Sequence, residues 1–113
     1  MKPGEIYILN FPFSDLSGSK KRPGLIISTE KHNRKTETVI MMALSTNLEL
    51  NYSVIISDKD LKEGSLFGDK GAVQYNNLFR AHNSVISKRI MKLKPETFQM
   101  IISKFKNEVL TKI

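Results

Sequence analysis

The chain has 113 residues, 40% of them hydrophobic, and a formal net charge of +7 at pH 7. This length fits a single domain, residues 1–113, with enough apolar side chains to form a core unaided by disulfides or metals. The absence of cysteine excludes disulfides, thiolate zinc sites and cysteine nucleophiles, and two histidines cannot form a metal site by themselves. We therefore expect no metal site and no cofactor.

The N-terminus and the charge balance indicate the setting in which the protein works. Residues 1–5 lack the apolar core of a signal peptide, and no apolar run is long enough to cross a bilayer. We expect a cytoplasmic protein without membrane contact. The excess of 18 Lys and Arg over 11 Asp and Glu favours polyanionic partners. Charge alone leaves both a nucleic acid and an acidic protein open as the partner.

Short apolar segments, separated by polar or Gly- and Pro-bearing stretches, occupy most of the chain. They are rich in Val, Ile, Leu, Tyr and Phe, which is typical of strands. Many short strands joined by turns, without alternating helices, indicate a barrel or a sandwich. The predicted strands cover residues 5–11, 24–28, 38–44, 52–56, 71–74, 78–80 and 85–90.

The stretch between the first two of these strands, residues 11–23, is predicted to be a cationic loop. Lys20, Lys21 and Arg22 can engage phosphates there, Arg22 with its planar guanidinium fork. Ser17 and Ser19 supply turn conformations and backbone N–H groups beside them. The alternative is a solvated hairpin loop with solubilising charges, which is also the simpler interpretation of a second predicted basic loop at 31–35.

Arg22, Ser45 and Thr46 stand next to buried strands and are the first candidates for chemistry. Pro23 favours an extended conformation for Arg22, which places the arginine at the start of an apolar strand. Ser45 and Thr46 directly follow the predicted strand 38–44, so two hydroxyls emerge where a buried run ends. They either cap a turn or hydrogen-bond a phosphate or a ribose hydroxyl beside Arg22, and the spacing permits both.

The C-terminal stretch changes its period and predicts a helix. Its apolar residues follow the three-and-four spacing of an amphipathic helix, and Pro95 suits the first helical turn. Met100 and Ile113 lie off the main apolar face, so we expect part of the helix to stay uncovered in a monomer. The predicted fold is mainly β, a small barrel with one closing helix. The main face consists of Phe98, Ile101, Ile102, Phe105, Val109 and Leu110.

A family resemblance rests mainly on the N-terminal residues. Gly4-Glu5-Ile6-Tyr7, followed by the run 11–28 with Arg22-Pro23 before an aliphatic strand, resembles the opening of PemK/MazF-like toxins. Ala43-Leu44-Ser45-Thr46 resembles the family's next signature, a strand that ends in one or two threonines. Gly71-Ala72-Val73 and the terminal helix continue the pattern more loosely, so the resemblance covers nearly the whole chain.

The resemblance implies a toxin of a type II toxin-antitoxin system, built as an SH3-like barrel and active as a homodimer. It further implies an endoribonuclease that cuts single-stranded mRNA without a metal and is held inactive by an acidic antitoxin. Arg22 matches the family's catalytic arginine, and Ser45 with Thr46 falls where its functional threonine lies. The chain departs from the pattern at Gln74 and Asn76, where some members carry an arginine and an acid.

RNA brings its own nucleophile to this reaction. Attack of the ribose 2′-OH on the adjacent phosphate leaves a 2′,3′-cyclic phosphate and a 5′-OH, so the protein needs to orient the strand and stabilise the extra negative charge. Arginine is a poor base because its guanidinium stays protonated in proteins, so we assign Arg22 to charge stabilisation and leave protonation of the leaving group open as a second role. The predicted RNA-binding residues are Ser17, Ser19, Lys20, Lys21, Phe67, Gln74 and Asn76.

Aromatic residues and two alternatives complete the expectations. Phe67, beside Gly68, is the best candidate to stack on a base, whereas the other aromatic residues are more typical of a core. Gln74 and Asn76 keep open a catalytically weak relative that only binds RNA or its antitoxin. A toxin of the same fold that acts on DNA gyrase is a third interpretation, for which the sequence offers no motif.

Overall fold

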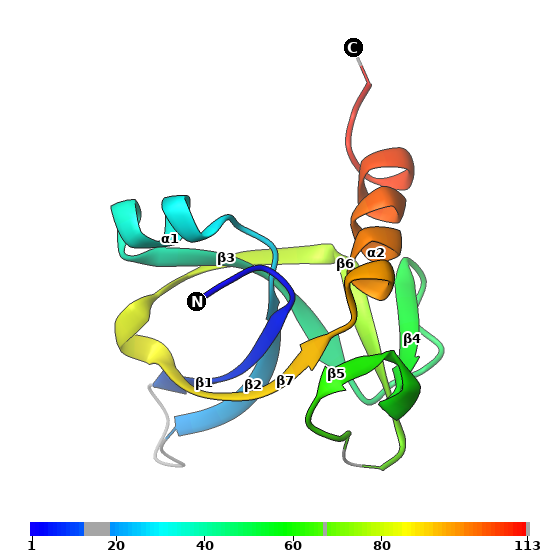
Figure 1. Ribbon diagram of the computed structural model, residues 1–113, viewed down its shortest axis with the longest axis horizontal. Helices are drawn as coiled ribbons and strands as arrows, with labels where there is room; N and C mark the ends of the chain where they lie inside the picture. Colours follow the sequence, from blue (N-terminus) through cyan, green and yellow to red (C-terminus); the bar gives the residue numbers. More distant parts are fainter. Residues whose placement is uncertain (13–18, 67, 113) are drawn as a thin grey trace.

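The computed structural model describes residues 1–12, 19–66 and 68–112, and in these ranges the chain forms a curled, seven-stranded sheet (Figure 1). All strand pairs are antiparallel, in the order β4-β6-β3-β2-β1-β7-β5. The strands are β1 (Glu5–Pro12), β2 (Ser19–Ile26), β3 (Thr38–Ser45), β4 (Ser53–Ser57), β5 (Leu61–Glu63), β6 (Lys70–His82) and β7 (Ile86–Leu93). The helices are α1 (Glu30–Thr36) and α2 (Pro95–Glu108), with two 3₁₀ turns, η1 (Asp58–Asp60) and η2 (Asn83–Val85). The predicted mainly β fold with a C-terminal helix is confirmed.

The sheet carries a hydrophobic cluster on each face. Neighbouring residues on a strand point to opposite faces, and accordingly Leu25 and Ile26 are both fully buried but belong to different clusters. The larger cluster includes Ile101 of α2, which is also fully buried. The smaller cluster lies around Leu9 and Met41. Burial on both faces explains why the strands appear in the sequence as nearly continuous apolar runs.

Helix α2 starts and packs as its sequence predicts. Pro95 occupies the first turn, where its missing N–H is no loss and Glu96 favours the positive end of the helix dipole. Phe98, Ile102 and Phe105 pack against the larger cluster around Ile101. Beyond the end of the helix, Val109 and Leu110 are 37% and 53% exposed, so the predicted apolar face is longer than the buried one.

Lys20, Lys21 and Arg22 lie on strand β2, so their predicted placement in a loop is wrong. The β1–β2 hairpin keeps a single register from Ile6↔Leu25 to Pro12↔Ser19, which extends both strands into the stretch interpreted as a loop. Ladder hydrogen bonds outweigh the low strand preference of a Lys-Lys-Arg run. Residues 13–18 lie outside the described part of the chain.

The predicted basic loop at 31–35 is a helix, α1. Thr29 caps it by accepting a hydrogen bond from the His32 amide at 3.2 Å, and Glu30 lies in its first turn. Asn33 is buried and donates from its amide to the carbonyl oxygens of Met1 and Ser28. A cap residue followed by an acid is a helix-start signal that the basic composition of the stretch obscured.

Candidate active site

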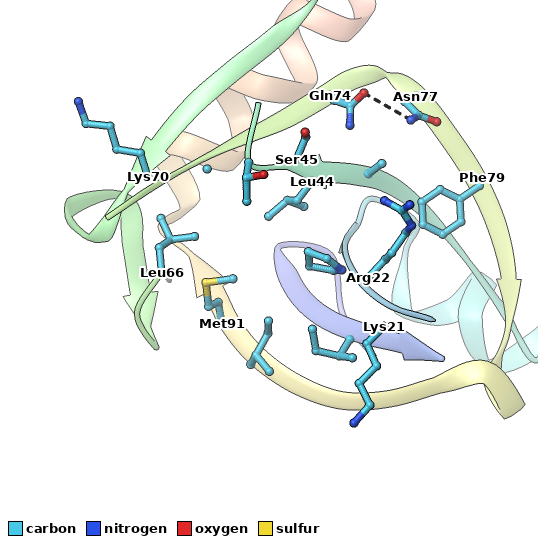
Figure 2. Close-up of a pocket in the computed structure, with 16 residues that line it drawn as sticks. Lys21, Arg22, Leu44, Ser45, Leu66, Lys70, Gln74, Asn77, Phe79 and Met91 are labelled. Carbon is cyan, nitrogen blue, oxygen red and sulfur yellow. Dashed lines mark hydrogen bonds between the residues drawn. The ribbon is translucent and has the colours of Figure 1, made fainter. Parts of the chain in front are cut away.

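A pocket of about 620 Å³ opens beside β2, β3 and β6 (Figure 2). Cationic and polar side chains surround an apolar lining, which is the usual composition of a site that binds and orients a ligand. The cations are Lys21, Arg22 and Lys70; the polar residues are Ser45, Thr46, Gln74 and Asn77; the apolar lining includes Ile8, Pro23, Ala43, Leu44, Leu66, Phe79, Ile90 and Met91.

The pocket forms where β2 and β3 part from each other. Their ladder runs from Ile26 and ends at the pair Gly24↔Ala43. The next residue of β2 beyond that pair is Pro23, which precedes Gly24 in the sequence and has no amide hydrogen with which to continue a ladder. The same register would set Arg22 opposite Ser45, but the two strands are no longer paired there, and both residues instead line the pocket.

A bulge in β6 forms a second part of the pocket. Strand β3 pairs with β6 up to Met42↔Leu78 and resumes at Ala43↔Gln74, which leaves residues 75–77 outside the ladder. Such extra residues re-aim side chains next to functional sites. Here the bulge brings Asn77 into the pocket lining together with Gln74, and the Asn77 Nδ2 atom donates to the Gln74 Oε1 atom at 3.5 Å (Figure 2).

Tyr75 fixes the bulge from the core side. Its side chain is buried, its hydroxyl donates to the Glu108 carboxylate of α2 at 2.7 Å, and its ring meets Tyr52 edge-on at 6.0 Å. Burial and the hydrogen bond to Glu108 raise the pKa of Tyr75 to about 12. The Tyr75 hydroxyl therefore stays protonated at neutral pH and keeps its hydrogen bond to Glu108 of α2.

The two hydroxyl candidates sit at the pocket end of β3. The Ser45 Oγ atom accepts a hydrogen bond from the Asn47 amide at 3.0 Å, so this side chain caps the turn and lines the pocket at the same time. A hydroxyl that accepts one hydrogen bond still has its own hydrogen to donate. Thr46 is exposed at the rim. The position of Ser45 therefore fits both predicted roles, capping a turn and hydrogen-bonding a phosphate or a ribose hydroxyl beside Arg22.

The structure brings together half of the ten predicted site residues. Five of them line the pocket, whereas Asn76 is exposed on the bulge and does not. Ser17 and Phe67 lie outside the described residues, and Ser19 and Lys20 are described only by their backbone in β2. Sequence reasoning missed Lys70 and Asn77 as pocket residues. The five that line the pocket are Lys21, Arg22, Ser45, Thr46 and Gln74.

The pocket is positively charged. Across the described residues, no ion pair involves Lys21, Arg22 or Lys70, and the pocket lining there contains no Asp, Glu or His. Figure 2 shows the Arg22 side chain directed toward Phe79, and Lys21 pointing away from it. An apolar pocket with unneutralised cations attracts a polyanion such as a nucleic-acid strand.

A separate polar cluster ties β1 to β5 and β7. The Arg89 guanidinium pairs with both Glu5, at 2.8 Å, and Glu63. Glu5 is buried and also accepts from the Lys2 amide at 2.7 Å. Burial by itself would raise the pKa of Glu5, but the hydrogen bonds from Lys2 and Arg89 lower it below its usual value. These groups do not line the pocket, so we assign them to the fold.

The described part of the chain contains neither a helix of membrane-spanning character nor a cluster of metal ligands. No helix there is long and apolar enough to cross a bilayer. No group of three or more His, Asp or Glu side chains there is placed to hold a metal ion.

Solved structures share this fold. An endoribonuclease bound to its cognate antitoxin from a mycobacterial species is 21% identical with a TM-score of 0.68, covering 94% of this chain and 89% of that one. The Form-II MazE-MazF structure from Deinococcus radiodurans is 16% identical with a TM-score of 0.75, covering 94% and 92%. The Mycobacterium tuberculosis toxin MazF-mt6 is 16% identical with a TM-score of 0.65, covering 89% and 93%. No protein with curated functions matches the chain.

The family assignment rests on the sequence match together with these folds. A family model of the PemK-like, MazF-like toxin of type II toxin-antitoxin systems matches residues 2–109, nearly the full length. The match includes both sides of the pocket, from β2 to the bulge in β6. The chain therefore belongs to the PemK-like, MazF-like toxins of type II toxin-antitoxin systems.

Proposed function

We propose that this toxin is a metal-independent endoribonuclease that cleaves single-stranded mRNA in the pocket around Arg22. One observation carries the proposal: Arg22 of β2, Ser45 at the end of β3 and Thr46 directly after it line the same cationic pocket. Solved relatives of the same fold include endoribonucleases. The family match and this pocket together support an RNA-cleaving reaction over a purely structural role.

The proposed chemistry uses the ribose as the nucleophile. The 2′ oxygen attacks the adjacent phosphorus and forms a new P–O bond, while the bond from phosphorus to the 5′ oxygen breaks. The 2′-OH proton passes to solvent, and the leaving 5′ oxygen takes up a proton. The products are a 2′,3′-cyclic phosphate and a 5′-OH, without consumption of water or any cofactor.

The side chains of the pocket supply charge and hydrogen bonds in this scheme. Arg22 stabilises the additional negative charge on the five-coordinate phosphorus, for which its planar fork is suited. Ser45 and Thr46 donate hydroxyl hydrogens to phosphate or ribose oxygens. Lys21 and Lys70 bind the flanking phosphates as point charges. Together they hold the 2′-OH in line with the bond that breaks.

The test is to incubate the purified protein with a long RNA in excess EDTA and to identify the ends of the fragments. We expect cuts at defined positions with 5′-OH and 2′,3′-cyclic phosphate ends. Cleavage that stops with EDTA and returns with magnesium would contradict metal independence. RNA binding without any cleavage would instead identify the weak, binding-only relative.

We also propose that an acidic antitoxin segment occupies the same pocket. The solved relatives include toxins bound to their cognate antitoxins, and the net charge of +7 favours an acidic partner. A peptide rich in Asp and Glu that covers Lys21, Arg22 and Lys70 would displace RNA. A synthetic peptide rich in Asp and Glu should inhibit cleavage in competition with RNA, and non-competitive inhibition would contradict a shared site.

A symmetric homodimer is the third part of the proposal. Strand β4 is an edge of the sheet, and its Ile55 is 49% exposed. Tyr52, the residue directly before the strand, is 48% exposed. Leu110, after α2, is 53% exposed. Apolar side chains on a free strand edge favour association between copies. Light scattering at micromolar concentration should show a dimer, and a monomer that retains full cleavage activity would contradict it.

A further inference from the structure

We propose that the amide pair Gln74–Asn77 reads one base of the RNA next to the cleaved bond, and that this base is adenine. The inference rests on the proposed function, since it assigns the base preference of the same pocket. It concerns Asn77, which no motif of the sequence singles out and which only the bulge in β6 brings into the pocket lining.

The hydrogen bond between the two amides leaves complementary groups free. Asn77 donates from Nδ2 to Gln74 Oε1, so Gln74 keeps both N–H groups and Asn77 keeps its carbonyl oxygen. At 3.5 Å this bond is longer than the usual 2.7–3.2 Å, so little is lost when the amides turn to a ligand. In Figure 2 the pair lies at one rim of the pocket, on the same side as Arg22 and Phe79.

A donor beside an acceptor matches the base edge of adenine. Asn and Gln amides pair with adenine by accepting from its N6 amino group and donating to N7. Guanine presents two acceptors, N7 and O6, on the same edge, which fit Arg or Lys but leave an amide oxygen unpaired. A bound base that covers the exposed Asn77 side chain removes water from its oxygen, and leaving that oxygen unpaired carries a desolvation cost, so the amide pair discriminates against guanine.

The backbone on the Gln74 side of the amide pair is firmly held. Gln74 is held in the ladder opposite Ala43 on one side and Ser53 on the other. Tyr75, the next residue, is buried and bonded to Glu108 of α2, and its backbone N–H donates to the Tyr52 carbonyl at 3.1 Å. A supported backbone limits how far the recognition groups can shift to suit the wrong base, so it favours selection by geometry.

The test compares cleavage maps of the wild type and of Asn77→Leu on one long RNA, with Asn83→Leu as the matched control. The wild-type map should show adenine at one fixed position beside the cut. In Asn77→Leu that preference should fall by roughly 5- to 150-fold, as expected for loss of one amide–base pairing, while other positions keep theirs. Asn83 is exposed on η2 and lies outside the pocket, so the Asn83→Leu change should leave the cleavage map unchanged.

A second variant tests recognition itself and not only a loss. Asn77→Arg replaces the amide with a double donor, so the preferred base at that position should change from adenine to guanine. A purely structural role for Asn77 predicts no such change. An Asn77→Leu map that keeps the wild-type adenine preference would overturn the inference, as would a wild-type map without adenine at a fixed position. If the wild type fails to cut RNA at all, the proposed function fails, which is a different outcome.

Discussion

Two arginines flank strand β1 and have opposite surroundings. Arg22 on β2 lies across from Leu9, and Arg89 on β7 lies across from Tyr7. Arg89 is neutralised by two carboxylates, whereas Arg22 makes no ion pair within the described ranges and faces the pocket. A cation that the fold leaves unpaired in an apolar pocket is available to a ligand, and one held by two carboxylates is not.

This contrast separates a site from a structural cluster of similar composition. Both regions contain an arginine on a strand that pairs with β1, and both strands belong to the curled sheet in Figure 1. They differ in where the compensating charge comes from: Glu5 and Glu63 of the chain itself for Arg89, and an RNA phosphate in the proposed function of Arg22. Changes at the two arginines should therefore affect different properties.

The largest expected effect is on cleavage, in Arg22→Ala. Losing one donor to a developing charge costs about 10²- to 10³-fold in rate, so cleavage should fall by that factor. The melting temperature should stay within about 2 °C, since Arg22 is exposed and unpaired in the described structure. The matched Arg80→Ala change, exposed on β6 and outside the pocket, should cut at the wild-type rate. Near-normal cutting by a folded Arg22→Ala protein would remove the central assignment.

The next effect is on stability, in Glu5→Gln. This change weakens the pairing with Arg89 and the Lys2 amide in a buried position, so the free energy of unfolding should fall by about 1 to 3 kcal/mol. The control is Glu63→Gln, at the exposed partner of the same arginine, which should cost less than about 1 kcal/mol. Urea denaturation measures both. Equal losses in the two variants would show that burial of Glu5 does not matter.

Acid should abolish the difference in the free energy of unfolding between the wild type and Glu5→Gln. The pKa of Glu5 is lowered from 4.5 in the folded state, so its contribution to stability is present above pH 4.5 and is lost as pH falls through the folded value. Denaturation of both proteins at several pH values between about 7 and 2 measures this. The stability difference between the two proteins should narrow only below about pH 4.5. A difference that stays constant with pH would contradict an ionised Glu5.

The smallest expected effect is in Lys70→Ala, at the pocket rim. Lys70 contacts one phosphate in the proposed function, so the negative slope of the logarithm of RNA affinity against the logarithm of salt concentration should become shallower by about 0.7. Lys59→Ala, exposed on η1 and outside the pocket, should keep the wild-type slope. Filter binding to a single-stranded RNA at several salt concentrations gives both slopes. An unchanged slope in Lys70→Ala would place the strand elsewhere.

The strands and the C-terminal helix could be predicted from the sequence because their signals are local. Apolar runs and the spacing around Pro95 depend only on neighbouring residues. The strand that carries Lys20 to Arg22 could not be predicted, since its ladder with β1 is set by pairing across the hairpin and overrides composition. Helix α1 had a start signal at Thr29 that its basic residues obscured.

The site shows the same division between local and long-range information. Arg22, Ser45 and Thr46 could be selected from their positions at strand ends and from the family resemblance. The place of Asn77 depends on a register shift between β3 and β6. The partners of Arg89 come from β1 and β5. Contacts between residues far apart in sequence are decided by topology, so sequence patterns did not distinguish Arg89, which is paired, from Arg22, which makes no ion pair in the part of the chain that the structure describes.

One measurement tests the central claim most directly: cleavage of an RNA oligonucleotide that carries a single 2′-deoxyribose at the mapped cut site. In the proposed reaction the nucleophile is the 2′-OH of the substrate and the pocket supplies charge stabilisation and hydrogen bonds. The wild-type protein should therefore bind this oligonucleotide as well as the all-ribose version and leave it intact, while it cuts the all-ribose version in EDTA. Cleavage of the deoxy-substituted bond at a comparable rate would contradict the account.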